Sequence, residues 1–177
     1  MVEAADARTR SVSNVIAGVG LALGGLLGLA GTLVAARNLQ SACWAVDGVG
    51  LIVAGVILGL KYFREGNDII GAGFLVFAMG SAVMLVGTAT TLQASVPSFG
   101  AGTALWVAGL LMISFPREFA FWTRLAGLIA SVLFAMVSGR IVWGEQLLPT
   151  ARPFPYFAYP FLVLALVGWI WKLRRAA

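Results

Sequence analysis

The chain has no histidine and a single cysteine, and these two shortages exclude most of the chemistry found in protein sites. Without histidine, its 177 residues lack the commonest metal ligand, the usual pH switch and the usual general base. Because Cys43 is the only cysteine, one copy cannot form an intrachain disulfide, a cysteine-rich metal site or an iron–sulfur cluster. We therefore expect no enzymatic activity, no cofactor and no metal.

Charged residues are also scarce. They make up 11% of the chain, whereas apolar residues make up 60%, and a soluble domain carries about 25% charged residues. The apolar residues gather in six long runs, at 14–36, 41–60, 69–91, about 96–115, 125–143 and about 154–171. In lipid no water satisfies the backbone, so a spanning segment is a helix of about 20 residues or a strand of a closed barrel. These runs are too continuously apolar for barrel strands. They predict an all-α integral membrane protein, with six transmembrane helices in an up-down bundle.

The positive charges predict how this bundle is oriented. Nine of the 12 lysine and arginine residues lie before the first run, between the second and third, between the fourth and fifth, or after the sixth. These nine are Arg8, Arg10, Lys61, Arg64, Arg117, Arg124, Lys172, Arg174 and Arg175. Only Arg37, Arg140 and Arg152 lie on the other side. The positive-inside rule therefore predicts that both termini are cytoplasmic.

We expect one membrane domain over residues 14–173, with a short cytoplasmic tail at 1–13 and a basic cytoplasmic end at 174–177. The first run is longer than the 7 to 15 residues of a cleaved signal peptide, so we expect a retained signal-anchor helix. Ten arginines against two lysines, with much alanine, glycine, valine and leucine, are typical of a GC-rich bacterium, which predicts the bacterial inner membrane. The net charge of +5 is spread over four segments, and this pattern suits lipid headgroups better than nucleic acid.

Two parts of the chain resemble each other. Residues 77–81 (Phe-Ala-Met-Gly-Ser) recur at 134–138 as Phe-Ala-Met-Val-Ser, and residues 53–55 (Val-Ala-Gly) recur at 107–109. A parallel duplication of a helical hairpin, relating the second and third spans to the fourth and fifth, would explain the match. The alternative is coincidence, because glycine, alanine and valine are abundant here.

Small residues predict where the helices touch. In lipid, burying leucine against leucine gains little, so helices associate through close contact at small side chains. Such residues recur every four positions in the first and fifth runs and every seven in the third. The predicted helix-packing residues are Gly20, Gly24, Gly28, Gly73, Gly80, Gly127, Ser131, Ala135 and Gly139. Because the first helix is terminal in the bundle, we expect it to present its glycines to another subunit of a homo-oligomer or larger membrane complex. The alternative is that 22 glycines merely reflect a membrane composition.

Two prolines interrupt the last run. A helix that began at Pro160 would extend only about 21 Å by Leu173, at about 1.5 Å per residue, which is short of the roughly 30 Å hydrocarbon core. We therefore predict that the helix begins near Pro155. We also predict a kink at Pro160, whose missing N–H would free a carbonyl group one turn earlier.

Asp47 and Arg140 are the only charged residues well inside apolar runs, where an unpaired charge costs about 2.5 to 3.5 kcal/mol. Both lie toward the predicted outer face. One hypothesis is that they meet between the two hairpins, in an outward-facing polar vestibule that also contains Thr88, Thr91, Gln93 and Glu145. Such a pair would either fix packing only or bind a solute or a proton. The third alternative is that they do not touch and that the Arg140 side chain reaches up to the membrane surface.

Two functions fit these features. The favoured prediction is a non-enzymatic structural or accessory subunit that contacts membrane lipids and partner helices through its small-residue faces. The alternative is a permease or channel for a small solute, an ion or a proton, with the vestibule around Asp47 and Arg140 as its outward opening. The cytoplasmic halves of the runs are nearly all apolar, and this feature favours the first prediction over the second.

Overall fold

The computed structural model describes residues 2–175, with side chains from Val12 onward, so the side chains of Arg8 and Arg10 lie outside the described part. Residues 2–175 form six helices and no strand. The helices are α1 (Val2–Leu33), α2 (Arg37–Arg64), α3 (Asp68–Gly87), α4 (Val96–Ser114), α5 (Phe121–Val142) and α6 (Ala158–Arg175). The all-helical prediction is confirmed. The four middle helices begin and end within four residues of the predicted runs, whereas α1 already begins inside the predicted tail.

Five of these helices are long and apolar enough to cross a membrane, namely α1 over Val12–Leu33 and the whole of α2 to α5. The chain is therefore a helical membrane protein. Helix α6 is not among the five. Its 18 residues extend about 27 Å, and Lys172, Arg174 and Arg175 occupy its last turn. Helix α6 is thus shorter than the other five and ends in three positive charges.

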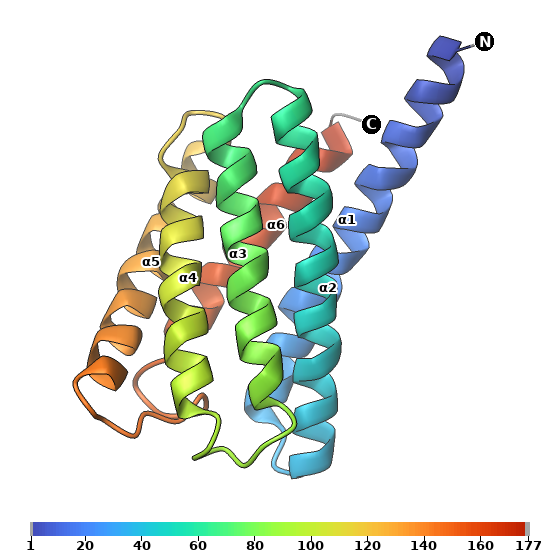
Figure 1. The fold of residues 1–177 in the computed structure, drawn as a ribbon. Coiled ribbons are helices and arrows are strands. Elements are labelled where there is room, and N and C mark those ends of the chain that lie inside the picture. The colour runs from blue at the N-terminus through green and yellow to red at the C-terminus, as the bar shows by residue number, and fades with distance from the viewer. Residues whose placement is uncertain (1, 176–177) are drawn as a thin grey trace.

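The six helices run alternately up and down and form a closed ring (Figure 1). Each helix packs against its neighbours in the sequence, and α6 also packs against α1, which closes the ring. The described ends of α1 and α6 lie together at the top of Figure 1, and we call this the terminus end. The connections 34–36, 88–95 and 143–157 lie at the opposite, distal end.

Aromatic side chains fill the centre of the ring. Phe74 of α3 meets Trp169 of α6 with ring centroids 4.9 Å apart, and Phe77 lies between Trp169 and Trp106 of α4, at 5.7 and 5.2 Å. These rings are all buried. We call the group the aromatic core; its members are Tyr62, Phe74, Phe77, Trp106, Phe119, Phe134 and Trp169. It joins helices that are not neighbours in the ring.

Lys172 closes the aromatic core at the terminus end. Its ammonium group lies 5.0 Å from the ring centroid of Phe119 and 5.9 Å from that of Tyr62. The same group forms an ion pair with Glu118 and donates a hydrogen bond of 2.7 Å to the Glu118 carbonyl oxygen. A cation held against aromatic faces and a carboxylate ties the end of α6 to the connection between α4 and α5.

The closest backbone contacts are made by glycines. A Cβ atom placed on Gly20 would lie 2.5 Å from the carbonyl oxygen of Gly50 on α2, and one placed on Gly80 would lie 2.7 Å from that of Gly102 on α4. Gly73 also faces α4. Only residues without a side chain permit such an approach. The predicted glycines of α1, Gly20, Gly24 and Gly28, therefore face α2 of the same chain, and the expectation that they present a free face to another subunit is wrong.

The stripe predicted on α5 is only half internal. Gly127 lies against the Ser114 hydroxyl group of α4, and Ser131 is buried, whereas Ala135 is exposed and Gly139 meets only Trp143 of its own helix. The reason is geometric. A spacing of four residues exceeds the 3.6 residues of one turn, so the stripe drifts around the helix by about 40° at each step.

The kink predicted at Pro160 does not occur. Helix α6 begins at Ala158, so Pro160 lies in its first turn. A first-turn N–H has no partner within the helix, and proline therefore costs nothing there. Residues before Ala158 form turns instead, in which the Ala158 N–H donates to the Pro155 carbonyl oxygen over 2.8 Å.

Candidate functional site

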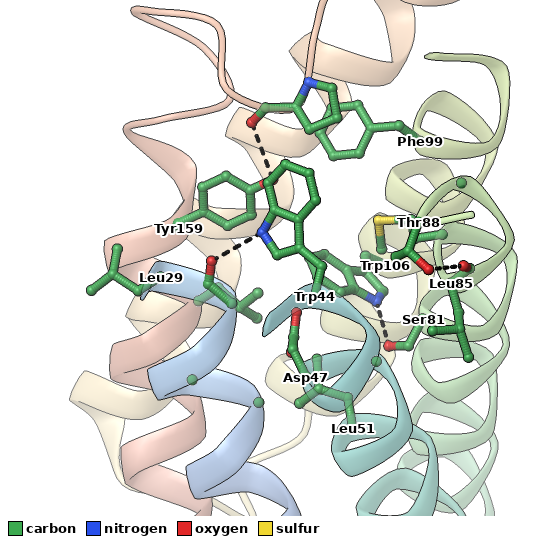
Figure 2. A pocket seen from close by; sticks show the side chains of 18 of the residues that line it. Leu29, Trp44, Asp47, Leu51, Ser81, Leu85, Thr88, Phe99, Trp106 and Tyr159 are labelled. Carbon is green, nitrogen blue, oxygen red and sulfur yellow. Dashed lines mark hydrogen bonds between the residues drawn. The ribbon is translucent and has the colours of Figure 1, made fainter. Parts of the chain in front are cut away.

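A cavity of about 80 Å³ lies in the distal half of the bundle, between α1, α2, α3, α4 and α6. Its polar and aromatic lining includes Trp44, Asp47, Ser81, Thr88, Trp106 and Tyr159 (Figure 2). A cavity volume of only about 10 to 15 Å³ is enough to hold one water molecule. The space therefore accommodates several waters or a small solute.

Glycines of α1 create the room in which the cavity residues of α2 lie. Trp44 and Asp47 are three residues apart, so they share one face of α2. Gly31 lies against the Trp44 indole, and a Cβ atom on Gly28 would lie 2.9 Å from Oδ2 of Asp47. Larger residues at these two positions would fill the space that now receives the indole and the carboxyl group.

Asp47 differs from every other buried polar group described. Its Oδ1 is the one buried side-chain nitrogen or oxygen atom in the described part of the chain that has no hydrogen-bond partner. Figure 2 shows the carboxyl group beneath the Trp44 indole, with Tyr159 on the α6 side and Trp106 on the α4 side. A buried carboxyl group costs free energy unless a charge or a donor meets it. The cavity therefore contains an acceptor with an unmet requirement.

The other polar groups of the lining are satisfied within the protein. The indole N–H of Trp106 donates to Oγ of Ser81 over 3.0 Å, and this hydroxyl group donates to the Phe77 carbonyl oxygen over 3.2 Å. The Thr88 hydroxyl group donates to the Leu85 carbonyl oxygen over 2.8 Å. Three further donors are used in the same way. They are Trp44 Nε1 to the Gly28 carbonyl, Ser95 Oγ to the Leu92 carbonyl and Ser98 Oγ to the Ser95 carbonyl.

The structure does not bring Asp47 and Arg140 together. Arg140 lies in the last turn of α5, where its guanidinium group pairs with Glu145 at 2.6 Å. Both side chains are nearly half exposed, at 43% and 48%. Gly144, with φ of +93°, turns the chain just before Glu145 and lets this carboxylate reach back. The local partner satisfies Arg140, and Asp47 is left without a counter-charge among the described side chains.

Only Asp47 and Thr88 of the six predicted vestibule residues line the cavity. Thr91 and Gln93 are exposed in the connection between α3 and α4, where the Thr91 hydroxyl group accepts a hydrogen bond from the Ala94 N–H. The predicted vestibule therefore separates into a cavity around Asp47 and an exposed ion pair outside it.

Sequence reasoning missed the aromatic walls of the cavity and a group of hydrogen bonds at its distal edge, which we call the clasp. Trp44 could have been found, because it precedes Asp47 by one helical turn, but nothing in the sequence links Trp106 or Tyr159 to Asp47. The clasp is formed by Arg37, which donates to the Thr90 carbonyl oxygen over 2.6 Å and to Oε1 of Gln40 over 2.9 Å. Gln40 in turn donates to the Gly31 carbonyl oxygen over 3.1 Å. These bonds join α1, α2 and the 88–95 connection.

Comparison of the chain with protein-family models, with curated proteins and with solved structures gives no match.

Proposed function

We propose that this chain is a non-enzymatic membrane permease that admits a small solute from the distal end into the cavity around Asp47. The observation that carries the proposal is Oδ1 of Asp47, which is buried without a hydrogen-bond partner among the described residues and lies beside a cavity. Ionisable residues within membrane spans are expensive, and they usually mark a substrate or ion pathway. A carboxyl group kept for packing alone would have its partner in the protein.

The aromatic core makes an open channel unsuitable and a gated permease suitable. Phe74, Phe77 and Trp169 meet across the centre of the ring, and they lie between the cavity and the terminus end. A solute can pass only if helices move. The contact between α1 and α6 is the best candidate for this motion, because a Cβ atom on Gly25 would lie at an ordinary 3.5 Å from Leu166. The glycine contacts of α1 with α2 are much tighter.

The same closed core favours a second function, an accessory subunit that binds a ligand without transporting it. This function retains the predicted partnership with lipids and with a homo-oligomer or larger membrane complex. Gly20, Gly24 and Gly28, which were expected to form it, do not support such an interface, since they pack against α2. The accessory role therefore depends on the aromatic core remaining shut when the cavity is filled.

We further propose six crossings of a bacterial inner membrane, with both termini in the cytoplasm and the cavity open toward the outer side. Lys61, Arg64, Arg117 and Arg124 at the terminus end support this orientation. The contacts of Gly109 argue against a hairpin duplication. In a duplication, Gly109 of α4 would pack against α5 in the same way as Gly55 of α2 packs against α3. Gly109 lies against α3 instead.

Cysteine accessibility tests the permease in vesicles of both orientations. In a Cys43→Ala background, Met84→Cys places a thiol in the cavity lining, and a membrane-impermeant thiosulfonate reports whether water reaches it. A permease alternates between two open forms, so we expect modification from either side of the membrane. Modification from the distal side alone would contradict the permease and support the accessory subunit.

Met79→Cys is the matched control on the same helix. Met79 is exposed on the outer surface of the bundle, so lipid should surround it and the reagent should not react from either side. If Met84→Cys also fails to react from both sides, neither the permease nor the ligand-binding subunit is correct.

A further inference from the structure

We propose that the ligand of the cavity is a small organic ammonium ion, whose positive charge lies against Asp47 and whose alkyl groups lie against the aromatic walls. This inference rests on the proposed function and specifies its substrate class. Four features carry it: the unused acceptor, the absence of unused donors in the described lining, the aromatic surroundings and the shortage of oxygen ligands.

Hydrogen-bond accounting argues against an anionic ligand. The indole and hydroxyl donors of the lining, on Trp44, Trp106, Ser81 and Thr88, are already bound to protein acceptors. An anion would therefore find no free donor among these groups and would face a carboxyl group. A cation meets the one group left over, Oδ1 of Asp47, and the attraction between opposite charges is strengthened where water is excluded.

The walls of the cavity determine that the cation is organic. Trp44, Phe99, Trp106 and Tyr159 line it together with aliphatic side chains. Aromatic faces attract cations through their quadrupole, and they also accept the methyl groups of an alkylammonium ion, as in the aromatic cages that bind quaternary ammonium ligands. A volume of about 80 Å³ limits the ligand to a few non-hydrogen atoms.

Inorganic ions fit this lining less well. A calcium ion takes about six to eight oxygen ligands, and magnesium requires near-octahedral oxygen coordination. In the described residues no group of three or more acidic, histidine or cysteine side chains converges on a point. One carboxyl group beside indole rings cannot replace the hydration shell of such an ion, whereas an alkylammonium ion is weakly hydrated and loses less on entering.

Binding of tetramethylammonium chloride to the purified full-length chain tests the inference. The probe has a full positive charge, four methyl groups and no N–H. Because Trp44 and Trp106 line the cavity, we expect a saturable change in tryptophan fluorescence and a rise in Tm with probe concentration. Sodium chloride at equal ionic strength and tert-butanol, a neutral molecule of similar shape, should give neither change. An equal response to tert-butanol would show an apolar pocket without charge selection and would overturn the inference.

Asp47→Asn tests the counter-charge while it preserves the shape of the side chain. We expect it to weaken tetramethylammonium binding by about tenfold or more, since one charge-assisted contact is lost. Glu145→Gln is the matched control, because this carboxyl group lies outside the cavity and pairs with Arg140; its affinity should equal that of the parent. Unchanged affinity in Asp47→Asn would contradict the inference.

Gly28→Ala provides a second variant in case Asp47→Asn folds poorly. The added Cβ atom would lie 2.9 Å from Oδ2 of Asp47, so the carboxyl group must shift, and we expect affinity to fall severalfold. Gly18→Ala on the same helix is its control, because nothing lies within 4 Å of that position. Equal affinities in the two alanine variants would argue against a ligand at Asp47.

Protection of Met84→Cys separates failure of this inference from failure of the proposed function. If the thiol is modified from both sides and tetramethylammonium slows the reaction, both proposals stand. If it is modified from both sides and tetramethylammonium has no effect, the permease stands and the substrate class is wrong. If it is never modified, both are wrong.

Discussion

The two halves of the bundle are built from the same helices and are filled in opposite ways. In the half nearer the termini, Phe74 and Trp169 meet across the ring at 4.9 Å, and Lys172 covers the cluster. In the distal half, Gly24, Gly28 and other small residues line a cavity. Cohesion between non-neighbouring helices is therefore concentrated in one half, and the capacity to receive a ligand in the other.

The halves also differ in how they treat polar groups. At the boundary between them, Trp106 and Ser81 satisfy each other and the Phe77 carbonyl group. In the cavity, Asp47 has a buried oxygen atom without a hydrogen-bond partner among the described residues. A satisfied buried polar pair gives rigidity, whereas an unsatisfied one lowers stability and persists where function needs it. The contrast leads to four tests.

Removing Trp169 should have the largest effect, because it breaks the filled half. Trp169→Ala would leave a void among Phe74, Phe77 and Phe119, and truncation of a buried aromatic residue destabilises by about 3 to 5 kcal/mol. Thermal unfolding of the purified protein in detergent measures the loss. The control is Trp171→Ala, two residues along α6 and 52% exposed, which should lower Tm far less. Equal losses would mean that the aromatic core does not hold the bundle together.

Adding a methyl group where two backbones touch should have an intermediate effect. In Gly80→Ala the new Cβ atom would lie 2.7 Å from the Gly102 carbonyl oxygen, which cannot move without shifting α4. Overpacking of this kind costs about 1 to 3 kcal/mol. Gly18→Ala, in open space, serves as its control and should leave Tm unchanged or slightly higher, because alanine favours helix more than glycine does. An unchanged Tm in the Gly80→Ala variant would show that the α3–α4 contact is loose.

Replacing Asp47 should have the smallest effect on stability, and in the opposite direction. Asp47→Asn removes a carboxyl group whose Oδ1 has no partner among the described residues, so we expect a rise of about 1 kcal/mol in the free energy of unfolding together with the loss of tetramethylammonium binding. A destabilised Asp47→Asn variant would show that the carboxyl group has a structural partner after all.

A double-mutant cycle of Asp47→Asn with Arg140→Gln sharpens the same contrast. Since Arg140 pairs with Glu145 at the surface, its replacement should not alter the effect of Asp47→Asn, and the two effects on Tm should add. A measurable coupling between the two substitutions would support the Asp47–Arg140 ion pair that the sequence suggested. Glu145→Gln with Arg140→Gln is the positive control, because that pair is in contact.

The positions of the helices were predictable and their contacts were not. Each apolar run became a helix because a backbone in lipid must satisfy its own hydrogen bonds, and short connections force antiparallel neighbours. The prediction of an Asp47–Arg140 pair was wrong because Arg140 pairs with Glu145 instead. The turn at Gly144 makes this contact possible, and nothing in the sequence shows it. Pro160 was misassigned for a similar reason, since the first residue of a helix depends on contacts outside it.

By itself the amino-acid sequence determined that the protein is helical and lies in a membrane, because hydrophobicity and length are local properties of each segment. It also marked Asp47 as costly to bury. Only the tertiary structure decided that the glycines of α1 face α2, that α6 closes the ring on α1, and that Trp44, Trp106 and Tyr159 surround a cavity beside Asp47. These features depend on which faces of distant helices meet, and that choice is made by packing over the whole bundle rather than by any one segment.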